Sequence, residues 1–260
     1  MRDSQLKLTD KTILLTGNLS QVGQSTAMTL TEMGANVIFL VDSEMINGAE
    51  RVASNITDSR EINDALGRAA ALSIDINSKD YQEVLSRSAE LFGGFDALVD
   101  LRLLDKDSPI NLATSEEDFS QVIQEETDVI SKLAEQTLPF LQGRNRGRII
   151  FSYFNALKLQ WPSETLTSEM EKLIQQYAGP SQKHRITINS LGVGITDEYL
   201  LAKYPKSGSL KNALEEIQSE TPTAAMVQAS QVANVIAFLS SPMSSAITAQ
   251  NINVNHGIDL

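Results

Sequence analysis

The chain has 260 residues, of which 42% are hydrophobic and 21% charged, enough to bury one substantial core in a single domain over 1–260. Its formal net charge of -12 argues against nucleic acid and membrane surfaces as partners, because clustered Lys and Arg normally bind phosphates. No cysteine, no apolar run of about 20 residues and no signal-peptide pattern are present, so we expect a cytoplasmic protein without disulfides or thiolate metal sites.

Short apolar runs alternate with longer segments of helical periodicity. The expected strands cover Thr12–Thr16, Asn36–Val41, Ala70–Asp75, Asp96–Leu101, Gly147–Tyr153, Arg185–Leu191 and Asn251–Asn255. The expected helices cover Val22–Met33, Asp80–Phe92, Glu116–Leu141, Glu164–Ala178, Leu210–Ser219 and Ala229–Leu239. Strands separated by helices pair in parallel, which predicts an α/β fold: a doubly wound, Rossmann-type sheet of about seven strands with helices on both faces.

The first strand leads into the turn TGNLSQVG. Gly17 and Gly23 suit a loop in which the backbone turns tightly and a pyrophosphate approaches the helix N-terminus. Gln21, however, stands where a further glycine is expected, and its side chain either changes the turn or fills space that phosphates need. The motif alone is compatible with nucleotide binding and with a plain connection between strand and helix.

Asp42 ends the second strand. A carboxylate there can accept hydrogen bonds from an adenosine ribose and repel a 2′-phosphate, which favours NAD over NADP. A solvated residue that caps the following turn is an equally good interpretation.

Several segments carry one family resemblance. LLTGNLSQVG is similar to a TGxxxGxG turn, SIDI to a strand whose Asp-Val pair holds adenine, and RITINSLGVG to a segment that usually ends in Pro-Gly. With GANVIFLVD, GRIIFSY and the C-terminal segment, in this order, the chain resembles the classical short-chain dehydrogenase/reductase (SDR) family along nearly its whole length. The cofactor-binding residues that the resemblance implies are Thr16, Gly17, Ser20, Val22, Gly23, Asp42, Asp75 and Ile76.

The resemblance implies hydride transfer to or from a nicotinamide, with a catalytic asparagine, serine, tyrosine and lysine. The lysine is needed because a phenol with an ordinary pKa of about 10 is a poor acid or base near neutrality. The corresponding positions of this chain hold, in that order, Glu126, Phe154, Ser163 and Thr167. All four catalytic positions therefore look lost, and the catalytic residues stay unknown.

The cofactor positions are also eroded. Asp100–Leu103 replaces a compact Asn-Asn-Ala-Gly turn that faces the adenosine, Val193 replaces the proline of Pro-Gly, and Ala249 and His256 stand where glycine is usual. We expect either no cofactor or NAD(H) bound with weakened affinity. We also expect no metal, because the histidines His184 and His256 lie far apart without spaced partners.

Three hypotheses follow for the function. The first is a catalytically degenerate SDR subunit that serves as a structural or regulatory partner in a homo- or hetero-oligomer, a dimer or tetramer packed through its long fourth and fifth helices, with an active SDR paralogue as one partner. The second is an active NAD(P)-dependent oxidoreductase on a small carbonyl, hydroxyl or acyl-thioester substrate, using non-standard residues around Tyr153 and Lys158. The third is a module that binds a nucleotide, acyl-CoA or other small molecule without turnover.

Overall fold

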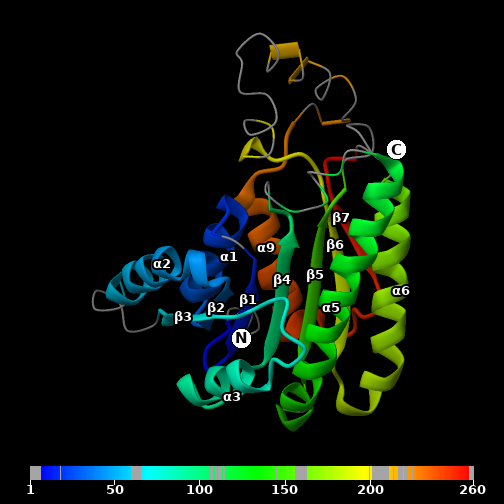
Figure 1. The fold of residues 1–260 in the computed structure, drawn as a ribbon. Coiled ribbons are helices and arrows are strands. Elements are labelled where there is room, and N and C mark those ends of the chain that lie inside the picture. Colours follow the sequence, from blue (N-terminus) through cyan, green and yellow to red (C-terminus); the bar gives the residue numbers. More distant parts are fainter. Residues whose placement is uncertain are drawn as a thin grey trace.

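A seven-stranded parallel sheet forms the centre of the computed structural model (Figure 1). The structure describes residues 7–17, 19–59, 66–105, 108, 110, 113, 115–144, 146–155, 163–198, 200, 211–212, 214–215, 219, 222–223 and 225–257. The strands are β1 (Thr12–Thr16), β2 (Asn36–Val41), β3 (Ala69–Ser73), β4 (Ala97–Leu103), β5 (Arg148–Phe154), β6 (Thr187–Val193) and β7 (Asn251–Val254). They lie in the order β3-β2-β1-β4-β5-β6-β7.

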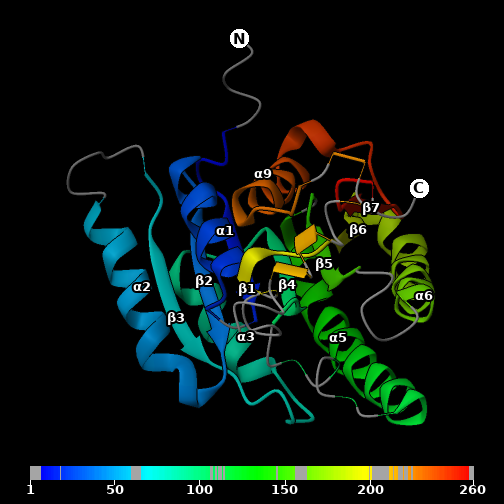
Figure 2. The same cartoon turned by 90° about the horizontal axis from the view of Figure 1, so that it is seen from above.

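Helices cover both faces of the sheet (Figure 2). Helices α1 (Gln21–Glu32), α2 (Ile46–Ser59) and α9 (Ala229–Ser240) contribute to one apolar cluster, and α3 (Gln82–Leu91), α5 (Glu116–Arg144) and α6 (Ser163–Ser181) to the other. Short 3-10 turns are η1 (Ser43–Met45), η2 (Gln182–His184) and η3 (Pro242–Ser244). Every residue of β1 is buried, as expected for a parallel strand covered on both faces.

The predicted doubly wound α/β sheet is confirmed, and the ends of the predicted elements differ from the observed ones by at most three residues. Among the helices whose bounds are given above, α2 was not predicted; its residues Ala49, Val52, Ala53 and Ile56 recur at helical spacing and pack on the sheet. Its first turn contains Asn47 and Gly48, weak helix formers that obscure this pattern. The helix expected over 210–219 lies largely outside the described residues.

The strand order reverses between β1 and β4. β1 pairs with β2 on one side and with β4 on the other, so that Thr16 faces both Leu40 and Asp100. In open α/β sheets the crevice beyond the carboxyl ends of the strands at such a reversal is the usual ligand site. The fold therefore brings the residues after β1, β2 and β4 to one crevice.

Two residues near the C-terminus have a left-handed backbone conformation. Ala249 and His256 have φ angles of 57° and 55°, in the left-handed region that glycine adopts without steric cost. Ala249 and His256 therefore hold a backbone conformation that glycine adopts more easily.

Candidate functional site

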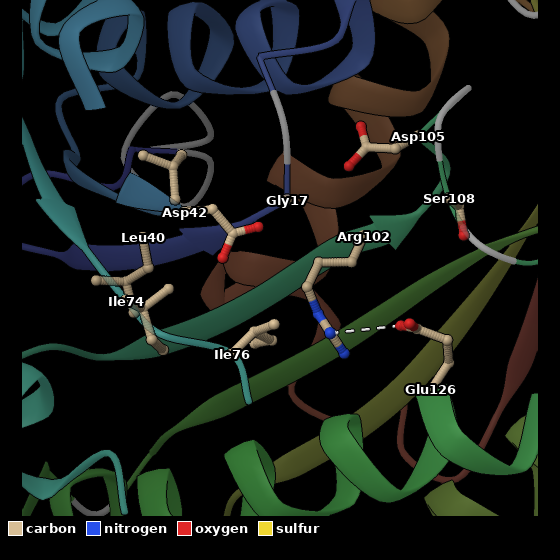
Figure 3. Close-up of a pocket in the computed structure, with 10 residues that line it drawn as sticks. Gly17, Leu40, Asp42, Ile74, Ile76, Arg102, Asp105, Ser108 and Glu126 are labelled. Carbon is tan, nitrogen blue, oxygen red and sulfur yellow. Dashed lines mark hydrogen bonds and ion pairs between the residues drawn. The ribbon is translucent and has the colours of Figure 1, made fainter. Parts of the chain in front are cut away.

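A cavity of about 190 Å³ occupies the crevice at the strand reversal (Figure 3). Its lining comes from the ends of β1, β2 and β4, the segments after β3 and β4, and α5; the residues are Gly17, Leu40, Val41, Asp42, Ile74, Ile76, Arg102, Asp105, Ser108 and Glu126. Three expected cofactor residues, Gly17, Asp42 and Ile76, thus share one cavity with Glu126. Its volume lies below the roughly 300–1,000 Å³ typical of small-molecule pockets.

Gly17 is required by packing within the protein. Its φ angle is 114°, which L side chains rarely adopt, and a Cβ atom at this position would lie 3.0 Å from the carbonyl carbon of Leu101. The first glycine of the turn therefore allows β1 to pass closely against the end of β4, with or without a ligand.

The N-terminus of α1 is held by two side chains of the protein itself. Ser20 is the N-cap, and its Oγ accepts a hydrogen bond from the Gly23 N–H at 3.1 Å. The Gln21 N–H donates to Oε2 of Glu198, a residue that follows β6, at 2.7 Å. A carboxylate is stabilised at a helix N-terminus for the same reason that a phosphate is: free N–H groups and the positive end of the helix dipole.

Arg102 lies across the cavity and pairs with two carboxylates. Its Nε donates to Asp100 Oδ2 at 3.2 Å and its Nη1 to Glu126 Oε2 at 3.4 Å, and Figure 3 shows the second contact spanning from β4 to α5. Asp100 is almost completely buried, with 1% of its side chain exposed. Among the residues described, none accepts a hydrogen bond from the buried Arg102 Nη2, and the buried Ser108 Oγ also has no partner, so a small polar ligand would find two donors here.

The surroundings of the cavity raise the pKa of two of its carboxyl groups. Burial raises the pKa of Glu126, although Arg102 opposes this, and burial also raises the pKa of Asp42, with Asp75 and Glu44 acting in the same direction. Burial alone would lower the pKa of the Arg102 guanidinium, but the carboxylates beside it raise it above its ordinary value. The arginine is therefore a fixed cation in this crevice.

The described residues do not fit the pyrophosphate of a dinucleotide. The Glu198 carboxylate takes an N–H at the helix N-terminus that an anionic phosphate would use, and two anions at one helix end repel each other. Arg102 and Glu126 meet across the remaining space. The sequence did not single out Glu198, since it lies 177 residues from Gln21 and follows a different strand.

The other expected cofactor residues have structural contacts. Thr16 is buried and its Oγ1 lies 3.5 Å from the Val99 carbonyl oxygen, while Val22 and Gly23 are buried on α1. Asp75 accepts a hydrogen bond from the Asn77 N–H within its own turn. Gln21 is exposed as the first residue of α1, so its side chain does not fill the cavity, and Leu103 belongs to the core.

Tyr153, the candidate for a substitute catalyst, is fully buried. Its hydroxyl donates to Thr167 Oγ1 of α6 at 3.1 Å and accepts from Asn251 Nδ2 of β7 at 2.7 Å. The structure thus brings Tyr153 and Thr167 together, but as a hydrogen-bonded link between elements. Ser163 begins α6, Phe154 ends β5, and Lys158 lies outside the described residues.

Within the described part of the chain, no three His, Asp or Glu residues are grouped so that they could hold a metal ion. None of the described helices combines the length and apolar character needed to cross a membrane.

The chain is similar to known proteins along nearly its whole length. A family model described as enoyl-(acyl carrier protein) reductase matches residues 17–259. A 3-oxoacyl-[acyl-carrier-protein] reductase of Vibrio cholerae is 25% identical over 265 residues, covering 97% of this chain and 99% of the relative. An NADPH-dependent aldehyde reductase-like protein, chloroplastic, of Arabidopsis thaliana is 25% identical over 264 residues, covering 97% of this chain and 95% of the relative. The crystal structure of a short-chain alcohol dehydrogenase from Sinorhizobium meliloti 1021 matches with a TM-score of 0.75 at 19% identity and covers 98% of both chains.

Proposed function

Because the chain belongs to the short-chain dehydrogenase/reductase family of oxidoreductases, we propose that it keeps the family fold as a scaffold and transfers no hydride. In this proposal it is a structural or regulatory subunit of an oligomer, assembled with further copies of itself or with an active relative.

The contact between Glu198 and the N-terminus of α1 carries this proposal. It replaces the phosphate that a dinucleotide would place there with a carboxylate of the protein, 2.7 Å from the Gln21 N–H. Without a bound nicotinamide there is no hydride to move. The Arg102–Glu126 pair across the cavity and the replaced catalytic positions support the same proposal.

Cofactor binding is the direct test. NADH and NADPH are titrated into the purified protein, with calorimetry and nicotinamide fluorescence as readouts, and we expect no saturable binding up to millimolar cofactor. Glu198→Gln removes the charge but keeps an acceptor for the Gln21 N–H, so binding of both cofactors should become measurable. Glu90→Gln, which makes the same charge change at an exposed position of α3, is the matched control and should bind no cofactor.

Turnover provides the second readout. The wild-type protein is incubated with NADPH and either a 3-oxoacyl thioester or an aldehyde, the substrate classes that the names of the relatives suggest. We expect rates equal to those of buffer alone. Micromolar cofactor affinity of the wild type, or oxidation of NADPH above background, would contradict the proposal.

An active reductase of acyl thioesters or aldehydes is the second candidate, and the match to acyl-carrier-protein reductases favours it. It requires NAD(P)(H) to displace the Glu198 carboxylate and the Arg102–Glu126 pair. Cofactor binding without turnover would instead select a nucleotide-binding or acyl-CoA-binding module.

A further inference from the structure

A second, larger cavity lies at the opposite edge of the sheet, where β4, β5 and β6 begin. Figure 1 shows this edge at the lower end of β4 and β5, away from the arrowheads. The cavity measures about 670 Å³, and its described walls come from the segments before β1 and β4, the starts of β5 and β6, and the ends of α6 and α9. Its volume falls within the roughly 300–1,000 Å³ range of small-molecule pockets.

The charge of this cavity is opposite to that of the chain. Four cationic side chains line it, from Lys11, Arg146, Arg148 and Arg185, against one described carboxylate, Asp96, in a protein whose net charge is -12. Asp96 is already engaged: one oxygen accepts from Lys11 Nζ at 2.9 Å and the other from the Thr12 N–H at 3.0 Å. No described carboxylate forms an ion pair with any of the three arginines.

Arg148 is the buried member of this group, with 6% of its surface exposed. Its Nη1 donates to the carbonyl oxygens of Arg146 and Gly147, both at 3.0 Å, while no described group accepts from the buried Nε. Burial lowers the pKa of this guanidinium, and the nearby Arg146 lowers it further. The Asp96 carboxylate acts in the opposite direction. A buried arginine with an unused donor and a like charge beside it would be stabilised by a further anion nearby.

Two further buried polar groups of the cavity wall lack partners. Thr187 Oγ1 and Ser240 Oγ belong to residues that line the cavity, and neither forms a hydrogen bond with a described group. Native proteins leave few buried polar atoms unpaired, and such atoms frequently mark a site for a ligand or water. These two hydroxyls are on residues that line the same cavity as the three arginines, and they would add to the donors available to an anion.

Arg185 occupies a backbone conformation that favours glycine. Its φ angle is 54°, at the end of η2, where the left-handed cap position is usually Gly or Asn. An arginine there costs free energy relative to glycine, yet it places a cation at the cavity.

From these observations we propose that this cavity binds the phosphate group of a small phosphorylated organic molecule. Three guanidinium groups and two hydroxyls suit a doubly charged, tetrahedral oxyanion better than a single carboxylate, which one arginine can match. The space beyond the anion, walled in part by Ile186 and Pro242, accommodates an apolar organic group. The site is distinct from the crevice at the carboxyl ends of the strands and does not depend on the function proposed for that crevice.

Calorimetry with three probes at constant ionic strength tests the proposal: inorganic phosphate, phenyl phosphate and benzoate. We expect phenyl phosphate to bind most tightly and phosphate more weakly, because only the former also fills the apolar part; benzoate should bind least. Amide NMR shifts on adding phenyl phosphate should concentrate around residues 182–188, far from Gly17.

The variants are chosen so that the fold survives. Arg185→Gly suits the left-handed backbone, and Thr187→Val removes a hydroxyl that has no partner, so neither should lower the thermal midpoint without ligand. Each should weaken phenyl phosphate binding, Arg185→Gly by about tenfold. Arg51→Gln, at an exposed position of α2, is the charge-matched control and should bind as the wild type does. No saturable binding of phenyl phosphate, or equal affinity in the wild type and Arg185→Gly, would overturn the proposal.

Discussion

Single residues decide how this crevice differs from a dinucleotide site. Arg102 pairs with Glu126 across the cavity, and Glu198 accepts a hydrogen bond at the N-terminus of α1. Both are places that a bound dinucleotide would occupy. Both residues act through charge at short distance, so a single substitution of either residue can test its effect.

Gly17→Ala should destabilise the fold by about 1–3 kcal/mol, because alanine is strained at a φ angle of 114° and its Cβ would contact the Leu101 backbone. Urea denaturation measures the change. Gly143→Ala is the control: a Cβ there meets nothing within 4 Å inside α5, so it should stabilise by about 0.5–1 kcal/mol. If Gly17→Ala and the wild type were equally stable, close packing would not be the reason for this glycine.

Glu126→Gln should flatten the dependence of stability on pH. Burial raises the pKa of Glu126, so between the ordinary value of about 4.3 and the raised value the folded state binds more protons than the unfolded chain. Its contribution therefore favours folding at low pH and is lost as pH rises through the folded pKa. Denaturation at pH 4 to 8 should show the stability of Glu126→Gln, relative to the wild type, increasing with pH.

The exposed Glu135→Gln on the same helix serves as its control and should follow the wild type across this range. A stability of Glu126→Gln, relative to the wild type, that falls as pH rises would show that the charge on Glu126 is favoured in the folded protein.

At the scale of elements, β5, α6 and β7 are joined by one buried hydroxyl. Tyr153 connects Thr167 and Asn251, at the end of the sheet where the SDR resemblance places the catalytic tyrosine and lysine. Strand β5 and helix α6, which the resemblance assigns to the catalytic site, are thus joined by hydrogen bonds of a buried tyrosine.

Tyr153→Phe should cost about 1–3 kcal/mol, because it leaves buried partners on α6 and β7 without the hydroxyl. A double-mutant cycle with Thr167→Val, measured by thermal and urea denaturation, should give less than additive losses, since both changes remove the same hydrogen bond. Additive losses, or a Phe variant as stable as the wild type, would argue that the hydroxyl serves another purpose.

The sequence predicted most elements because apolar runs and helical periodicity are local signals. It missed α2, where Asn47 and Gly48 in the first turn mask the amphipathic pattern. Gly17, Asp42 and Ile76, which the resemblance assigns to one cofactor site, line the same cavity because the ends of neighbouring parallel strands share an edge. The contact between Glu198 and Gln21 and the Tyr153–Asn251 hydrogen bond could not be predicted, since pairing between residues so distant in sequence depends on the tertiary arrangement.

At the scale of the whole molecule, charge is distributed unevenly. The acidic chain concentrates arginines around the cavity at the amino ends of the strands and exposes acidic residues on the outer helices, such as Glu125 and Asp128 on α5 and Glu171 on α6. If copies of this chain pack through α5 and α6, like charges face each other in the contact.

Self-association should therefore strengthen with salt, because added ions screen repulsion between acidic faces. Sedimentation velocity in about 20 mM and about 500 mM salt should show a larger oligomer fraction at the higher concentration. Replacing Glu125 and Asp128 by Gln and Asn should reproduce the effect at low salt. An oligomer that dissociates as salt is added would instead point to an interface held by opposite charges.

The close passage of Gly17 against Leu101 also bears on how glycine-rich turns are understood across protein sequences. A chain folded this way needs that glycine whether or not a nucleotide binds. Its presence therefore shows how closely two neighbouring strands pack. Glu198 is more informative about ligand binding than Gly17, because its carboxylate accepts a hydrogen bond at the helix N-terminus, where a phosphate would bind.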